Sequence, residues 1–140
     1  MISVGLSWEP LSLDKLTEFV SVPEAGAVSS FLGIARNDNQ GESVTALEFE
    51  AYEPMALKQL QRVAQGILDK FEVQKVAIWH RLGVVKVGEA AVAIVVSSAH
   101  RKAAIEGCAL ALERLKSDVP VFKKEVFVFS APRWVANRSL

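Results

Sequence analysis

Cysteine and histidine are scarce in this sequence, which has one cysteine, Cys108, and two histidines, His80 and His100, among 140 residues. A single cysteine excludes a disulfide within the chain, and so few candidate ligands argue against a zinc site. The motifs GxxxxGK[ST], GxGxxG and GxSxG are also missing. We therefore expect neither a metal nor a cofactor. Any chemistry should depend on lysine, arginine and histidine, a set that suits an anionic substrate and a lysine acting as proton carrier or nucleophile.

An excess of one charge sign is missing too, because 16 basic residues balance 16 acidic ones and the formal net charge is zero. Such a chain is not favoured to bind nucleic acid through charge alone. The longest apolar run, residues 90–96, is far too short to span a bilayer. The first ten residues lack the basic segment and cleavage pattern of a secretory signal. We therefore expect a cytoplasmic protein with no membrane or nucleic-acid partner.

Apolar residues are plentiful, at 51% of the chain. This content is enough for a single domain over residues 1–140, with some apolar surface left for a partner. Strands are expected at residues 2–8, 27–35, 44–52, 73–80, 90–97 and 121–129, and helices at 12–20, 55–71 and between about 98 and 118. A small β arm, folded as a hairpin, is expected at 82–89. Because strict β-α-β alternation is missing, we predict an α+β fold with a mostly antiparallel sheet and helices packed on one side.

The third predicted helix carries an unusual group of charges. Ala103, Gly107, Cys108 and Ala111 follow a helical spacing, so Cys108 is expected to be a small core residue. Ser97 or Ser98 is expected to cap the start of this helix, as Ser12 caps the first one. His100, Arg101 and Lys102 occupy its N-terminal end, where acidic residues are usual. Together with the free amides of the first turn they form either an anion site or a solvated basic turn, and the sequence leaves both readings open.

Other basic residues also have two readings. Arg36 leaves a buried strand and can hold a phosphate or carboxylate, or pair with Asp38 or Glu42 on the surface. Lys116 can take part in chemistry or complement the C-terminus of the helix. Lys123 and its neighbour Lys124 can bind an anion or protect an edge strand from aggregation. The pair His80-Arg81 is expected at the surface, near a turn. In the tail, residues 130–140, Trp134 is expected to dock on its own domain or on a second subunit.

Six short motifs in this order resemble the large, catalytic subunits of molybdopterin synthase, the MoaE family. They cover nearly the whole chain, from about residue 25 to residue 134, and their specificity lies in their order rather than in any one of them. The motifs are Phe31-x-Gly33-x-x-Arg36-x-x-Asn39-x-Gly41, Glu50-x-Tyr52-x-x-Met55-Ala56, His80-Arg81-x-Gly83, Gly88-Glu89, Ser98-x-His100-Arg101 and Lys116-x-x-x-Pro120-x-Phe122-Lys123-Lys124-Glu125.

The resemblance implies a fold, a reaction and partners. The fold is of the α/β-hammerhead type, to which the small β arm would belong. The reaction is sulfur transfer to cyclic pyranopterin monophosphate, which forms the dithiolene of molybdopterin in molybdenum cofactor biosynthesis. The sulfur arrives as a thiocarboxylate on the C-terminal Gly-Gly of a small ubiquitin-like subunit. Two large subunits form a central dimer with a small subunit at each end, a heterotetramer overall.

The resemblance also assigns roles to single residues. Lys116 and Lys123 match the active-site lysines of the family. Arg36, His100 and Arg101 match its substrate-pocket residues, and Arg138 matches a pocket arginine in the tail. Phe122 stands where a tryptophan is common, and the chain ends two residues after Arg138 where many relatives continue.

One helix separates two of these residues. His100 and Lys116 are 16 positions apart, which is roughly 24 Å along a helix at 1.5 Å per residue. If both touch the substrate, the pocket is composite, with His100 and Arg101 supplied by the dimer mate. Two rival readings are a non-catalytic anion-binding subunit that docks a partner's tail, and a phosphate-binding domain with no protein partner.

Overall fold

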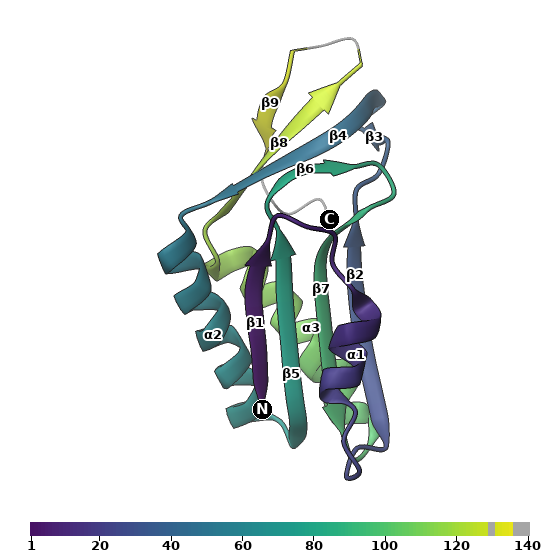
Figure 1. Cartoon of the computed structure of the whole chain (residues 1–140), viewed down its shortest axis with the longest axis vertical. Helices are drawn as coiled ribbons and strands as arrows, with labels where there is room; N and C mark the ends of the chain where they lie inside the picture. The colour runs from purple at the N-terminus through teal and green to yellow at the C-terminus, as the bar shows by residue number, and fades with distance from the viewer. Residues whose placement is uncertain (129–130, 136–140) are drawn as a thin grey trace.

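Two β-sheets form the framework of the protein (Figure 1), whose computed structural model describes residues 1–128 and 131–135. The first sheet has the order β1-β5-β7-β2. Its strands are β1 (Ile2–Ser7), β2 (Ala27–Ile34), β5 (Val73–Arg81) and β7 (Ala90–Ser98). The β1–β5 pair is parallel and the other pairs are antiparallel. This largely antiparallel arrangement confirms the α+β class predicted from the sequence.

The second sheet crosses over one end of the first (Figure 1) and is organised around β4 (Glu42–Ala51). β4 pairs with β8 (Val121–Phe127), and also with β6 (Gly83–Lys86) and β3 (Asp38–Asn39). β9 (Arg133–Val135) extends the sheet beyond β8. The small arm expected at residues 82–89 is thus a single strand, β6, and not a hairpin. Part of the expected tail is also a strand, because residues 133–135 pair with β8, and Trp134 stays 52% exposed there.

Two long helices cover one face of the first sheet and a short helix covers the other. α2 (Glu53–Lys70) and α3 (Arg101–Asp118) pack on one face, as expected, and α1 (Leu13–Val20) packs on the opposite face. β5 and β7 are apolar on both faces, so a one-sided layer of helices would leave Ala77, Ala93 and Val95 in water. Leu16 and Val20 of α1 cover these three residues and form a separate small core with them.

The ends of the helices follow local capping rules. Ser12 caps α1 as predicted, because its hydroxyl accepts from the backbone N–H of Lys15 at 3.2 Å. The predicted Ser97 or Ser98 cap of α3 is wrong. Both serines are buried in β7, where they pair with β2, and the helix begins after His100. The pairing of β7 with β2 continues two residues beyond the apolar run at 90–96, through Ser98. The helix therefore starts later, at the basic residues.

The main core joins both sheets to the two long helices. Phe49 of β4, Leu60 and Ile67 of α2 and Leu115 of α3 belong to one buried cluster with the strands of the first sheet. Cys108 is 5% exposed and belongs to this core, as expected. Within the described residues, none of the helices has the length and apolar content needed to cross a membrane.

Candidate active site

Two lysines meet where α3 passes into the second sheet. Lys116 lies in the last turn of α3, which ends because Pro120 follows and β8 begins at Val121. Residues of β8 alternate between buried and exposed, and Lys123 falls on the buried face with an exposed fraction of 2%. β8 is paired on both sides, with β4 and β9, so the edge-protection reading of Lys123 is wrong.

Burial changes the acid–base behaviour of both lysines. It lowers the pKa of Lys116 to about 8, and the positive charge of Lys123 contributes to the same shift. Burial also lowers the pKa of Lys123, the charge of Arg36 adds to this effect, and the Glu125 carboxylate opposes it. Desolvation disfavours the ammonium form, and neighbouring cations disfavour it further. An amine that exchanges its proton near neutral pH is suited to acid–base or nucleophilic work.

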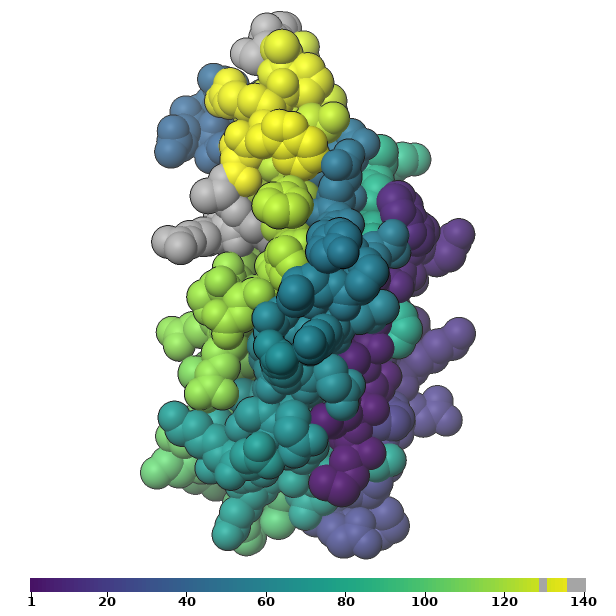
Figure 2. Space-filling view, turned by 90° about the vertical axis from the view of Figure 1, so that its left-hand side faces the viewer, coloured from purple at the N-terminus to yellow at the C-terminus, as the bar shows by residue number. Residues whose placement is uncertain are grey.

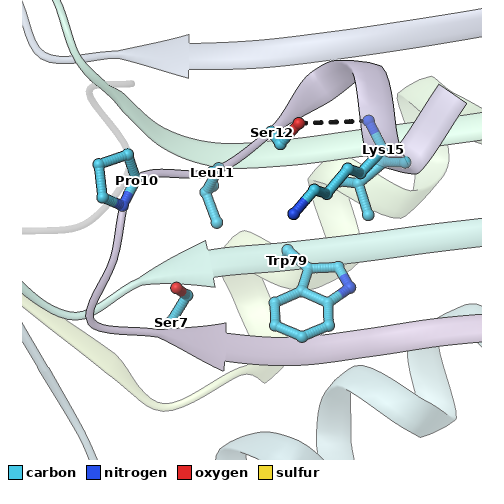
Figure 3. Close-up of a pocket in the computed structure, with 7 residues that line it drawn as sticks. Ser7, Pro10, Leu11, Ser12, Lys15 and Trp79 are labelled. Atoms are coloured by element: carbon cyan, nitrogen blue, oxygen red, sulfur yellow. Dashed lines mark hydrogen bonds between the residues drawn. The ribbon is translucent and has the colours of Figure 1, made fainter.

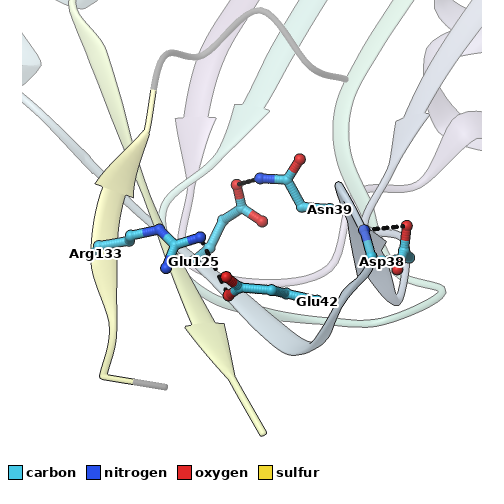
Figure 4. Close-up of polar contacts among 6 residues, drawn as sticks. Asp38, Asn39, Glu42, Glu125 and Arg133 are labelled. Carbon is cyan, nitrogen blue, oxygen red and sulfur yellow. Dashed lines mark hydrogen bonds and ion pairs between the residues drawn. The ribbon is translucent and has the colours of Figure 1, made fainter. Parts of the chain in front are cut away.

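A buried carboxylate connects this lysine pair to the loop that carries Arg36. Glu125 is 3% exposed and accepts a hydrogen bond of 2.7 Å from the side-chain amide of Asn39 (Figure 4). At the outer end of the same region, Arg133 pairs with Glu42 at 3.1 Å. These contacts hold the β3–β4 hairpin, residues 38–51, against β8 and β9. They keep the segment that follows β2 beside the lysines.

Arg36 itself is exposed, and its charge acts on Lys123. Asp38, one of its two expected partners, accepts from the backbone of Gly41, and Glu42, the other, binds Arg133. Among residues 1–128 and 131–135, Arg36 takes part in neither of the two ion pairs of the structure. The surface ion pair with Asp38 or Glu42 is therefore not formed among these residues, and anion binding by Arg36 stays a prediction.

The other predicted pocket residues lie elsewhere. His100 is the N-cap residue of α3 and Arg101 is its first residue, and both are exposed. They stand at the far end of the helix from Lys116 (Figure 1), roughly 24 Å away at the rise of an α-helix. One chain therefore does not bring the two groups together, as the spacing predicted. Arg138 lies outside the described residues.

Sequence reasoning missed the position of His80 and Arg81, which are 0% and 6% exposed and not at the surface. β5 continues through Arg81, and the second sheet covers its end. The sequence does carry a signal for the burial of His80. Val76, Ile78 and His80 are two positions apart, so they lie on one face of the strand, and the first two belong to the core. Burial lowers the pKa of His80 to about 4; the hydrogen bond to the Arg81 backbone opposes this shift, and the charge of Lys116 adds to it.

A groove on the second sheet offers apolar surface beside the site. It has a volume of about 330 Å³ and is lined by Glu50, Phe122, Trp134 and Val135. Phe122 is 56% exposed and Trp134 is 52% exposed. Lys124 lies 5.2 Å from the centre of the Trp134 ring, a cation–π distance, and 3.4 Å from Glu48. In Figure 2 the yellow segment that includes β9 lies at the upper end of this side of the molecule, above α3.

A second hollow lies on the opposite side of the first sheet, between α1 and β5 (Figure 3). Its volume is about 230 Å³, and Lys15 and Trp79 lie on facing sides of it. Lys15 is the one charged side chain among its described lining residues. This hollow contains none of the predicted site residues. Throughout residues 1–128 and 131–135, no group of three or more His, Cys, Asp and Glu side chains is placed to hold a metal ion.

Comparisons with known proteins agree with the resemblance seen in the sequence. The family model "MoaE protein" matches residues 6–118. A molybdopterin synthase catalytic subunit of Bos taurus is 42% identical over 93% of this chain and 69% of its own length. The catalytic subunit of Dictyostelium discoideum is 42% identical over 97% of this chain and 88% of its own length.

A solved structure shares the fold as well. The crystal structure of molybdopterin synthase from Staphylococcus aureus superposes with a TM-score of 0.88 at 36% sequence identity, and the match covers 93% of this chain and 94% of that one. The curated relatives are named as catalytic subunits, which confirms the expectation of an enzyme. From the family model, the sequence identity and the shared fold together, the chain belongs to the MoaE family.

Proposed function

We propose that this chain transfers sulfur from the C-terminal thiocarboxylate of a small ubiquitin-like subunit to cyclic pyranopterin monophosphate, forming the dithiolene of molybdopterin. The observation that carries this proposal is the pair of partly buried Lys116 and buried Lys123, with the charge of exposed Arg36 acting on Lys123. The names of the relatives support the reaction, since they are catalytic subunits of molybdopterin synthase. A cytoplasmic location belongs to the same proposal.

The cationic site suits two anionic reactants. A thiocarboxylate and a cyclic phosphate repel each other, and fixed positive groups in a site of low polarity offset that repulsion. Lys123 and Arg36 would hold the phosphate. Lys116 would orient the thiocarboxylate or move a proton as the sulfur attacks the pterin side chain, because the pKa of its amine is lowered to about 8.

The active assembly in this proposal is a dimer of this chain with a small subunit at each end. His100 and Arg101 are exposed at the start of α3, remote from Lys116 of the same chain. A dimer mate would supply them to complete the pocket around the phosphate, and Arg138 would join them from the tail. The apolar groove near Phe122 and Trp134 offers surface for the neighbouring subunit.

The test is single-turnover conversion of the cyclic pterin phosphate by the purified protein and the thiocarboxylated small subunit. We expect dithiolene product from the wild type and a loss of roughly 100-fold or more in Lys116→Ala, with partner binding retained. Lys124→Ala is the matched control, because Lys124 is the next residue of β8 and lies on its other, partly exposed side.

The outcomes separate this proposal from its rivals. Equal product from Lys116→Ala would move the catalytic part to Lys123. No product from the wild type, under conditions where the small subunit binds, would support the non-catalytic anion-binding subunit, to which the exposed groove also lends itself. A monomer that never binds a small subunit would support the phosphate-binding domain with no protein partner.

A further inference from the structure

His80 is a fully buried imidazole in the wall of the lysine site. It lies near the end of β5, between Leu6 of β1 and Val92 of β7, and its exposed fraction is 0%. Its ring meets the ring of Phe49 edge to face, with centroids 4.9 Å apart and planes at 70°. Phe49 is also the cross-strand partner of Lys123. His80 is thus tied by packing to the strands that position the site.

One hydrogen bond fixes which nitrogen of His80 carries the proton. Nδ1 lies 2.8 Å from the backbone carbonyl oxygen of Arg81. A carbonyl oxygen can only accept, so Nδ1 carries the hydrogen and donates it. Burial lowers the pKa of His80 to about 4, so the ring is neutral at physiological pH. In this tautomer Nε2 bears a lone pair and can only accept.

That acceptor has no partner in the chain as described. Within residues 1–128 and 131–135, His80 Nε2 is buried and makes no hydrogen bond. An unpaired buried acceptor lowers stability, and one beside a reactive group is a candidate for a function. The cation whose charge reaches His80 is Lys116. The surrounding charges come from β8, which supplies Lys123 and Glu125, and from the segment after β2, which supplies Arg36.

A fifth charged group near His80, the guanidinium of Arg81, points elsewhere. The guanidinium of Arg81, the next residue on β5, donates to the backbone oxygen of Val84 at 3.1 Å. Successive residues of a strand face opposite sides of the sheet, so Arg81 does not share the side of His80. The basic groups whose charges act on one another therefore form a chain that runs from exposed Arg36 through Lys123 and Lys116 to His80.

We propose that His80 is a positioning residue for Lys116. The Lys116 amine donates a hydrogen bond to His80 Nε2, and this bond directs the lone pair of the amine into the site. A neutral amine has two N–H bonds and one lone pair, and holding one N–H restricts where the lone pair points. The bond forms when the long side chain of Lys116 rotates toward the ring, a motion that such side chains make rapidly. The inference rests on the proposed function only in giving Lys116 a part in the chemistry.

The experiment measures the titration of Lys116 by NMR in the full chain with labelled lysine carbons, without substrate. His80→Phe keeps a ring against Phe49 and removes the acceptor, and His80→Gln places an amide oxygen near the position of Nε2. We expect the pKa of Lys116 to fall by about one unit in His80→Phe, because the charged amine loses a hydrogen-bond acceptor. In His80→Gln it should stay close to the wild-type value. Ile78→Val, on the same buried face of β5, is the packing control.

Kinetics supply a second readout that packing alone does not give. Single-turnover sulfur transfer should fall about tenfold in His80→Phe and recover in His80→Gln, with the KM for the cyclic pterin unchanged. An unchanged Lys116 titration in His80→Phe would overturn the inference. A shifted titration in a chain that transfers no sulfur would leave the hydrogen bond standing and reject the proposed function instead.

A measurement on wild-type His80 covers the case in which His80→Phe does not fold. The nitrogen resonance of His80 Nε2 should move in Lys116→Met and move much less in Lys123→Met, because only Lys116 donates to it. Equal effects of the two substitutions would mean that charge alone acts on the ring, and the hydrogen bond would be rejected.

Discussion

The two ends of α3 carry basic residues in opposite surroundings. Its first turn exposes His100, Arg101 and Lys102, and its last turn half-buries Lys116 against the second sheet. Burial lowers the pKa of Lys116 to about 8. The number of cations is larger at the start of the helix, but the amine with the lowered pKa lies at its end. Burial is the larger cause of the lowered pKa of Lys116, and the neighbouring charge of Lys123 adds to it.

The largest effect is expected in a test of whether the two ends of α3 contribute to one active site. Arg101→Ala and Lys116→Ala should each lower sulfur transfer at least about tenfold in dimers that carry one variant alone. An equal mixture, refolded together, should regain about a quarter of the wild-type activity, because half of the dimers are mixed and each has one intact composite site. Activity is measured by single turnover of the mixture. No recovery would show that the two ends act in the same chain or in separate steps.

A smaller effect, on the free energy of unfolding, is expected from the β3–β4 hairpin that lies beside Lys116 and Lys123 at the end of α3. Asn39→Ala should lower the free energy of unfolding by roughly 1–2 kcal/mol, because buried Glu125 loses its amide donor. Urea unfolding measures this change, and Asp38→Ala is the control, since the Asp38 side chain is exposed and its contact with the backbone N–H of Gly41 is long, at 3.4 Å. Equal losses in both variants would mean that the hairpin as a whole, and not the Glu125 contact, supports the site.

The two ends should also differ in how pH affects stability. Lys116 has a lower pKa in the folded chain than in the unfolded one, so the unfolded chain binds more protons between about pH 8 and the usual lysine value of about 10.4. Its burial therefore destabilises the fold below pH 8, and this penalty disappears as the pH rises. Thermal unfolding should show that Lys116→Met is more stable than the wild type at pH 7, with the difference shrinking by pH 10.

The matching substitution at the exposed end should show no such trend. Lys102→Met differs from Lys116→Met mainly in exposure, so its stability difference from the wild type should not follow pH in this way. The same trend in both variants would assign the effect to the net charge of the chain.

The smallest effect is expected on the stability of a single chain when a residue at the exposed start of α3 is changed. Arg101→Ala should change the free energy of unfolding by less than about 0.5 kcal/mol, because Arg101 is exposed at the helix start. Denaturant unfolding at low protein concentration measures it. A larger loss would show that the basic first turn stabilises the folded chain by itself.

Local patterns predicted much of this molecule. The α+β class, the capping of α1 by Ser12 and the separation of His100 from Lys116 all follow from spacing along the sequence. The roles of Lys116 and Lys123 came from the resemblance, and their burial could not be read from their neighbours. It depends on the second sheet, in which Phe49 pairs with Lys123 and His80 packs against Phe49.

Two of the wrong predictions, those for His80-Arg81 and for the arm at 82–89, share one physical cause. His80-Arg81 was expected at the surface because a turn follows it, but the second sheet crosses over that turn. The sequence predicts that the arm at 82–89 pairs with itself as a hairpin, but in the structure β6 pairs with the longer strand β4. Short-range signals describe where a strand ends, and they do not report which distant segment covers its end.

The pairing of β4 with β8 has a consequence for how the protein is made. Phe49 and Lys123 are cross-strand partners, and 123 − 49 gives 74 positions between them. During synthesis, the first sheet and α2 can form while β8 is still inside the ribosome, since domains fold as their segments emerge. The lysine pair is assembled only when β8 inserts beside β4. The contact between β4 and β8 that positions Lys123 is therefore completed late, after the first sheet and α2.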